Sequence, residues 1–207
     1  MKEIPSPTLP LVGLLDFGAS HLKAVAARRP NPVVAARSAG KQTFEVVWAR
    51  HQDDVREAQR LRYDVFANEM GARLQNVPGA PPHHDIDAFD DYCEHLLVRT
   101  LASDDQASTV VGTYRVLTPG AARRAGGYYS DTEFDLSGLR RLRPQMAELG
   151  RSCVHAEHRS GGVILALWGA LAGFMHDNGL DTMVGCASIG MRDGGHVAAS
   201  LWQQLRA

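Results

Sequence analysis

The sequence lacks an apolar run long enough to cross a bilayer. A membrane-spanning helix needs about 20 predominantly apolar residues, and the longest uncharged apolar stretch, residues 161–175, falls short of that. We predict that this stretch is a buried helix. Residues 1–15 contain Glu3 and scattered prolines, so they make a poor signal peptide. Both absences favour a cytoplasmic protein.

Cysteines are few, and neither sign of charge dominates. The formal net charge of −1 excludes a generally basic nucleic-acid-binding protein. The three cysteines, Cys93, Cys153 and Cys186, form no Cys-x-x-Cys motif. Each lies in an apolar stretch, so we predict buried free thiols in a reducing compartment. The length of 207 residues and the content of 44% hydrophobic and 22% charged residues are typical of one globular domain.

Several catalytic and metal-binding signatures are missing. The chain has no Gly-x-Ser-x-Gly elbow of a serine hydrolase and no Gly-x-Gly-x-x-Gly dinucleotide turn. His83-His84-Asp85-x-Asp87 could suggest a metal loop. As an EF-hand, however, this loop lacks the glycine at its sixth position and has Leu96 where the bidentate glutamate belongs. We therefore predict no metal site.

The residue pattern predicts one mixed α/β domain over residues 44–207, after a flexible N-terminal arm over residues 1–43. The predicted strands are 44–49, 95–101, 109–117, 148–154 and 182–189, and the predicted helices are 53–71, 161–178 and 195–205. This order predicts a mixed, mostly antiparallel central sheet with helices on both faces. Because the pattern stops without closing strands, we expect the last strands of the sheet to be missing.

Charged residues stand at the edges of the predicted strands, where a charge is costly unless it is paired or used. They lie in three stretches: Asp85-x-Asp87-x-Phe89-Asp90, Gly112-Thr113-Tyr114-Arg115, and Glu148-x-x-Arg151. Together they predict a pocket for a cationic group beside a potential general base. This combination suits the transfer of an acyl group to an amine.

These stretches, with Arg62-Tyr63-Asp64-Val65-Phe66, resemble the GNAT acyltransferase superfamily over residues 44–206. More narrowly, they resemble the branch that contains acyl-homoserine-lactone synthases and the bacterial ornithine N-acyltransferases that make lyso-ornithine lipid. The segment Gly185-Cys186-Ala187-Ser188-Ile189 favours the ornithine enzymes. Signal synthases usually have a tryptophan shortly after the Arg-x-x-Val-Phe motif, where this chain has Met70-Gly71-Ala72.

The resemblance implies an N-acyltransferase that moves a 3-hydroxyacyl chain from acyl carrier protein to the α-amine of ornithine, the first step of ornithine-lipid biosynthesis, without a cofactor. Alternatives are a signal synthase of the same fold, a non-catalytic acyl- or carrier-binding module, and an inactive fragment. Two groups of basic residues, residues 17–41 and the arginines from Arg123 to Arg159, are suited to an anionic inner-membrane surface or an acidic protein. They are equally compatible with a solvated surface.

The expected acceptor site combines acids and arginines. Glu148 is the candidate base, or else a structural partner of Arg151 or Arg115. Asp87 and Asp90 are candidates for binding the cationic groups of ornithine, and Asp85 is a weaker one. Arg62, Arg115 and Arg151 are candidate contacts of the substrate. Arg62 and Arg115 either clamp a carboxylate or hold Asp87 and Asp90 in place.

The expected donor site follows the strand that contains Glu148. The resemblance implies that the phosphopantetheine arm lies along this strand and that its phosphate approaches Arg159-Ser160-Gly161-Gly162. Glycines there permit close approach, and free N–H groups at a helix start favour an anion. The stretch departs from the usual Gly-rich acetyl-CoA loop, which favours acyl carrier protein over free CoA. Phe66, one turn after Arg62, either belongs to the core or lines the acyl pocket.

Overall fold

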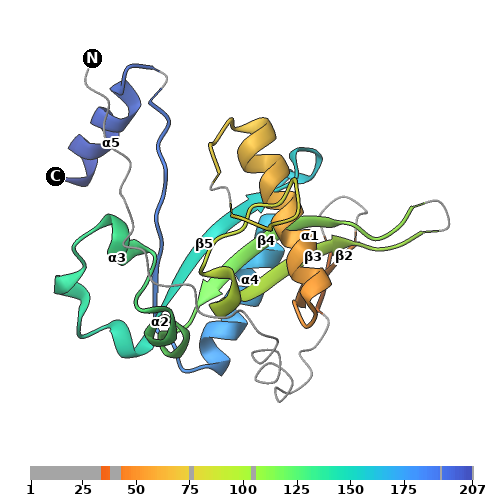
Figure 1. Ribbon diagram of the computed structural model, residues 1–207, viewed down its shortest axis with the longest axis horizontal. Helices are drawn as coiled ribbons and strands as arrows, with labels where there is room; N and C mark the ends of the chain where they lie inside the picture. Colours follow the sequence, from red (N-terminus) through yellow and green to blue (C-terminus); the bar gives the residue numbers. More distant parts are fainter. Residues whose placement is uncertain (1–33, 38–42, 75–76, 104–105, 192, 207) are drawn as a thin grey trace. The chain divides into compact units, whose positions relative to one another are not determined.

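A six-stranded sheet organises the chain in the computed structural model, which describes residues 34–37, 43–74, 77–103, 106–191 and 193–206 (Figure 1). In spatial order its strands are β1 (Val34–Arg37), β2 (Thr43–Trp48), β3 (Glu94–Thr100), β4 (Val110–Leu117), β5 (Met146–Val154) and β6 (Thr182–Val184). Neighbouring strands are antiparallel except β5 and β6, which are parallel. The predicted mixed, mostly antiparallel sheet is confirmed.

Two predicted boundaries need correction. β1 lies inside the predicted arm of residues 1–43 and pairs with β2, so the sheet begins before residue 44. Its sequence Val-Ala-Ala-Arg shows little alternation, and alanine is depleted in strands. The rest of the arm, residues 1–33 and 38–42, lies outside the described residues. The strand predicted over residues 182–189 ends at Val184, where its pairing with β5 ends.

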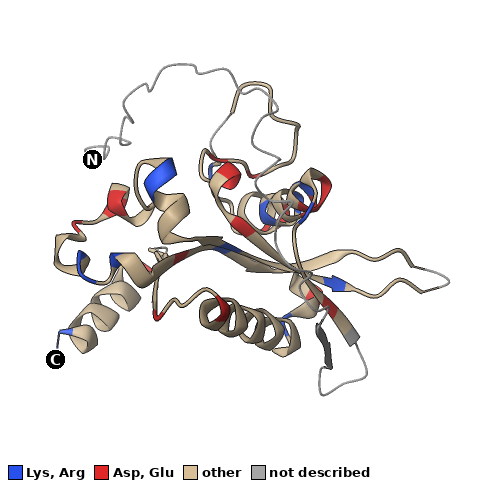
Figure 2. Cartoon of the chain, turned by 90° about the horizontal axis from the view of Figure 1, so that it is seen from below, with Lys and Arg blue, Asp and Glu red and all other residues tan. Residues whose placement is uncertain are grey.

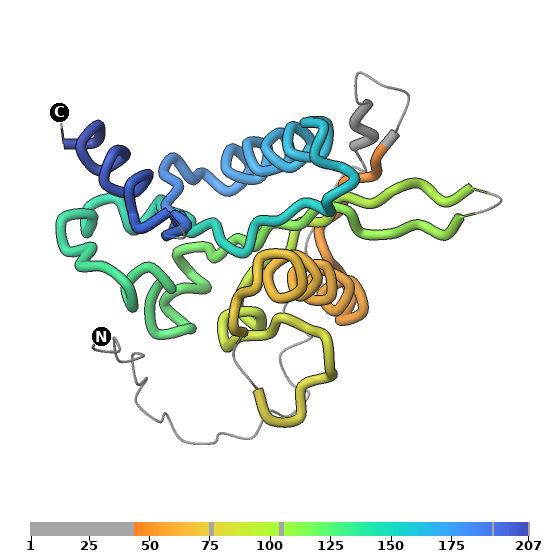
Figure 3. Tube along the Cα trace, turned by 90° about the horizontal axis from the view of Figure 1, so that it is seen from above, coloured from red at the N-terminus to blue at the C-terminus, as the bar shows by residue number. Residues whose placement is uncertain are grey.

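Helices cover both faces of the sheet (Figure 2, Figure 3). α1 (Gln52–Tyr63), extended by a π-helical turn at Asp64–Glu69, lies on one face, and α4 (Gly162–Asp177) lies on the other. We call these the α1 face and the α4 face. The remaining α-helices are α2 (Pro119–Ala125), α3 (Ser130–Glu133) and α5 (His196–Leu205). Within the described ranges, no helix has the length and apolar character needed to span a bilayer.

The α4 face holds the largest apolar core. Val163, Leu167 and Leu171 of α4 are fully buried against strand residues. These strand residues are Phe44, Val46, Leu96, Val98, Val111, Val116, Ala147 and Leu149. Gly112 on β4 lets the helix approach, because a Cβ atom there would overlap the side chain of Val163. Burial of apolar side chains holds α4 on the sheet. The charged motifs lie on the opposite face, the α1 face.

Candidate active site

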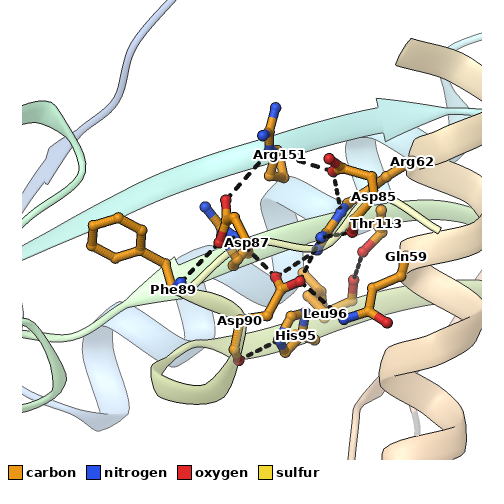
Figure 4. A network of polar contacts seen from close by, with 11 residues as sticks. Gln59, Arg62, Asp85, Asp87, Phe89, Asp90, His95, Leu96, Thr113 and Arg151 are labelled. Carbon is orange, nitrogen blue, oxygen red and sulfur yellow. Dashed lines mark hydrogen bonds and ion pairs between the residues drawn. The ribbon is translucent and has the colours of Figure 1, made fainter. Parts of the chain in front are cut away.

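Arg62 is the centre of a buried ion-pair network on the α1 face (Figure 4). Its Nε donates to Asp85 Oδ2 at 2.8 Å, while Nη1 and Nη2 donate to the two carboxylate oxygens of Asp90 at 2.9 and 2.8 Å. Nη2 also donates to the Asp85 carbonyl oxygen. The side chain is 1% exposed. Of the two predicted roles for Arg62, the geometry matches holding the acids in place.

Arg115, on strand β4 beneath α1, also belongs to this network. Its Nη1 donates to Asp87 Oδ1 at 2.6 Å and to Asp90 Oδ1 at 2.9 Å. Gln59 of α1 donates to Asp90 Oδ2 at 2.9 Å. Burial opposes ionisation of Asp90, but Arg62 and Arg115 outweigh it and hold its pKa well below the usual range. Asp90, a predicted substrate contact, is therefore occupied by protein donors.

His95 is a further buried side chain of the network, and it is neutral. Burial lowers its pKa more than the neighbouring Asp90 raises it. Its Nε2 lies 3.0 Å from the Asp90 carbonyl oxygen, to which the neutral ring can donate. We call Gln59, Arg62, Asp85, Asp90, His95 and Arg115 the inner network.

Arg151 and Asp87 form the outer boundary of this network, and we call them the outer pair. Arg151 Nε lies 3.4 Å from Asp85 Oδ2 and 3.7 Å from Asp87 Oδ2, and the Arg151 side chain is 33% exposed. Figure 4 shows its terminal nitrogens pointing away from the network, and among the described residues only its Nε lies within ion-pair distance of an acid. The guanidinium lies 5.6 Å above the ring of Phe66. Arg151 can therefore still donate hydrogen bonds to an anionic group, and Asp87 can still accept one from a cationic group.

A change in the backbone of β5 explains how Glu148 and Arg151 reach the same face. Side chains of a regular strand alternate between faces, so residues three apart should point to opposite sides. Ala147 and Leu149 pack on the α4 face, whereas Cys153 packs with Leu61 of α1. Arg151 has a φ of 50°, and the β4–β5 register shifts between Thr113 and Arg115. This irregularity reverses the alternation, so Arg151 joins Glu148 on the α1 face.

Glu148 is buried against the start of α3. Its Oε2 accepts from the Tyr129 amide at 2.7 Å, and its Oε1 accepts from the Ser130 amide at 2.7 Å and from the Ser130 hydroxyl. Among the described residues Glu148 forms no ion pair, so the predicted alternative of pairing with Arg151 or Arg115 is wrong. Each carboxylate oxygen can accept two hydrogen bonds, so Oε2 keeps one open position.

The cysteines divide into two kinds, and one differs from the prediction. Burial raises the pKa of Cys153 to about 12 and raises that of the half-buried Cys93, so neither thiol is activated. Cys186 is exposed instead of buried, and its Sγ lies 3.3 Å from Ser130 Oγ.

The sequence did not predict the roles of Ser130 and Tyr129, because their contacts with Glu148 span 18 and 19 residues and follow no motif.

The predicted donor segment lies where β5 leads into α4. Gly161 has a φ of 99° and precedes the first turn of α4, which no side chain caps. Arg159 donates from both terminal nitrogens to the carboxylate of Glu69, at 2.5 and 2.7 Å. β6 pairs with β5 only up to Glu148, so among the described strands none borders the later part of β5 on that side. Phe66 packs beside the small cluster of Leu61, Val65 and Cys153.

Two groups of side chains could be considered for a metal ion. In the predicted loop, Asp85 and Asp87 already contact arginines, so the loop does not offer the several free oxygen ligands that a metal ion such as Ca²⁺ needs. His155, Glu157 and His158 place ligand atoms within 4.8 Å of one another. His155 Nδ1, however, accepts a hydrogen bond from the Glu157 amide, so this nitrogen is not free to bind a metal ion.

Comparison with known proteins places these observations in a family. A model described as an acetyltransferase (GNAT) domain matches residues 61–169. L-ornithine N(alpha)-acyltransferase of Brucella abortus is 39% identical over 149 residues, which are 70% of this chain and 53% of that protein. The Rhizobium meliloti protein of the same name is 38% identical over 181 residues, or 86% and 59%. This chain thus spans 53% to 59% of the length of these curated relatives.

Solved structures include the AHL synthase LasI, with a TM-score of 0.49 and 19% identity over 70% of this chain and 72% of that one. The CoA-dependent acyl-homoserine lactone synthase BjaI, solved with SAM and isopentyl-CoA, has a TM-score of 0.48 and 22% identity over 72% and 66%.

Proposed function

Because the chain belongs to the GNAT acetyltransferase family, we propose that it is an L-ornithine N(alpha)-acyltransferase that takes a 3-hydroxyacyl chain from acyl carrier protein. The observation that carries this proposal is the 37–39% identity to four relatives of that name. The reaction would be the first step of ornithine-lipid biosynthesis. We place it in the cytoplasm, at the inner membrane surface, where the arginine-rich segments can meet anionic lipid.

The outer pair suits an amino acid that carries both charge signs. Arg151 presents free guanidinium nitrogens for the substrate carboxylate, and Asp87 Oδ2 is open to the side-chain ammonium group. The inner network supports this arrangement from below, since Arg115 holds the other oxygen of Asp87 at 2.6 Å. In this proposal Asp90, Arg62 and Arg115 act through Asp87 and do not touch the substrate.

Glu148 is proposed as the base for the α-amine. An amino acid's α-amine is largely protonated at neutral pH, and it must lose a proton before it can attack a thioester. The amides of Tyr129 and Ser130 hold the Glu148 carboxylate in place, and the open position on Oε2 can take the proton directly or through a water molecule. The nucleophilic nitrogen then attacks the acyl carbon, and the thiol of the carrier departs.

The donor is proposed to follow the unpaired part of β5 toward the start of α4. The open strand edge can meet the amides of a phosphopantetheine arm, and the uncapped N–H groups after Gly161 favour its phosphate. Arg159, two residues before Gly161, is proposed to contact this phosphate as well. An acidic carrier protein fits the arginines of this region.

The test is to incubate the protein with 3-hydroxyacyl carrier protein and a panel of amino acids, and to identify products by mass spectrometry. We expect N-acylornithine from the wild type and a rate at least about 100-fold lower from Glu148→Gln. Glu45→Gln on β2 is the matched control and should retain wild-type activity. Full activity in Glu148→Gln would remove the proposed base. No product with any amine would favour a non-catalytic carrier-binding module.

A further inference from the structure

A hydrogen-bonded chain leads from the buried Glu148 to the exposed thiol of Cys186. The hydroxyl of Ser130 donates to Glu148 Oε1, and its oxygen lies 3.3 Å from Cys186 Sγ. Ser130 itself is 1% exposed, so this hydroxyl is shielded from solvent. Because both neighbours contact one oxygen atom, the thiol lies only two hydrogen bonds from the proposed base. A thioester reaction needs a base at the nitrogen and an acid at the sulfur, and both atoms are attached to one carbon.

The position of Cys186 brings the thiol to the proposed donor path. It follows β6 by two residues, at the point where pairing with β5 has ended. Gly185 keeps the chain close to β5 there, because a Cβ atom would lie 2.7 Å from the Leu149 carbonyl oxygen. Tyr129 donates its amide to Glu148, and the next residue, Ser130, contacts Cys186 Sγ, so the start of α3 links the thiol to the proposed base.

We propose that Cys186 is the general acid that protonates the departing thiolate of the acyl donor, an inference that rests on the proposed acyltransfer. The nitrogen–carbon bond forms and the carbon–sulfur bond breaks, while the amine proton passes to Glu148. Cys186 gives its proton to the leaving sulfur. The substrate's ammonium group gives up two protons through Glu148, which releases them to solvent. The exposed thiolate of Cys186 regains one proton from solvent, so both side chains return to their initial state. No oxidant or other reactant is needed.

A thiol is well matched to this task. The side chain of Cys186 is an alkyl thiol, and so is the leaving group of a carrier-bound thioester. Proton transfer between two groups of the same chemical type is nearly balanced in energy, the condition under which general-acid catalysis is effective.

The experiment compares Cys186→Ala with wild type on two acyl donors. One is an acyl pantetheine thioester, whose alkyl thiolate needs a proton. The other is an acyl thiophenyl ester, whose thiolate leaves unprotonated at neutral pH. We expect about 100-fold loss with the first donor and nearly none with the second. Cys186→Ser should retain part of the activity, and Ser188→Ala, two residues along, should match the wild type.

Equal losses on both donors, or no loss on either, would overturn the proposal. So would detection of an acyl group on Cys186 by mass spectrometry, because the thiol would then be a nucleophile. Circular dichroism of each variant verifies that it is folded. If the wild type acylates no amine even with 3-hydroxyacyl carrier protein, the proposed function fails and this inference fails with it. If the wild type is active and Cys186→Ala equals it, only this inference fails.

Discussion

The inner network and the outer pair use the same types of residue in opposite ways. Arg62 and Asp90 of the inner network have side chains at most 3% exposed, and protein donors and acceptors occupy them. Arg151 of the outer pair is 33% exposed, and its terminal nitrogens make no hydrogen bond to the described residues (Figure 4). A charged motif can therefore contain both scaffold and recognition residues, and only the contacts distinguish them.

Breaking the inner network should have the largest effect on stability. Arg62→Met leaves the carboxylates of Asp85 and Asp90 buried without their main partner. We expect the free energy of unfolding to fall by about 3–5 kcal/mol, measured by urea denaturation. Arg56→Met is the matched control on α1, since its pair with Asp53 is mostly exposed, and it should cost about 0–0.5 kcal/mol. Equal effects of the two variants would refute the assignment of Arg62 as scaffold.

Acid should weaken the inner network in two separate pH ranges. Because the folded-state pKa of His95 is lowered, its contribution is complete above the unfolded value of about 6.5 and is lost as pH falls below it. Asp90 has a lowered folded-state pKa too, so its contribution is complete above about pH 4 and is lost below that. Denaturation as a function of pH measures both ranges.

Two substitutions separate these ranges. His95→Gln should flatten the curve of unfolding free energy just below about pH 6.5, and Asp90→Asn should flatten it below about pH 4. If His95→Gln leaves the upper range unchanged, another group must titrate there.

Substitution in the outer pair, unlike substitution in the inner network, should lower activity without lowering stability. Arg151 has a φ of 50°, a conformation that costs a residue with a Cβ atom about 1 kcal/mol. Arg151→Gly should therefore leave the unfolding free energy unchanged or raise it by up to about 1 kcal/mol, while ornithine acylation falls. Thermal unfolding and the product assay test this together. A loss of several kcal/mol would show that Arg151 is structural.

The smallest effect is expected at the donor segment. Glu69→Gln releases Arg159 from an exposed ion pair, so the unfolding free energy should change by less than about 1 kcal/mol. The freed arginine is then available to the donor phosphate, and the KM for acyl carrier protein should fall about 2- to 5-fold at low salt. An unchanged or higher KM would contradict a role of Arg159 in donor binding.

The sequence predicts much of this fold because its signals are local. The run containing Leu96 and Val98 and the uncharged run of α4 identify core elements from their own composition. β1 was not predicted, because its four residues do not alternate clearly between apolar and polar side chains. The end of β6 depends on where a partner strand stops, which Gly185-Cys186-Ala187 does not encode locally.

The candidate site was predicted less completely than the fold. The acids, Arg115 and Arg151 were found from their places beside the predicted strands, and Arg62 was found from the family resemblance. Their division into scaffold and recognition depends on contacts 23 to 28 residues apart. The reversal of side-chain alternation at Arg151 follows from one backbone angle. Ser130 carries no motif and becomes relevant only when α3 folds against Glu148.

The most direct test of the division between inner network and outer pair is the KM for ornithine in Arg151→Gln, measured together with its unfolding free energy. Loss of one charge-assisted contact predicts a KM about 10- to 100-fold higher, with stability within about 1 kcal/mol of wild type. An unchanged KM would contradict the account, because Arg151 would then be another scaffold residue.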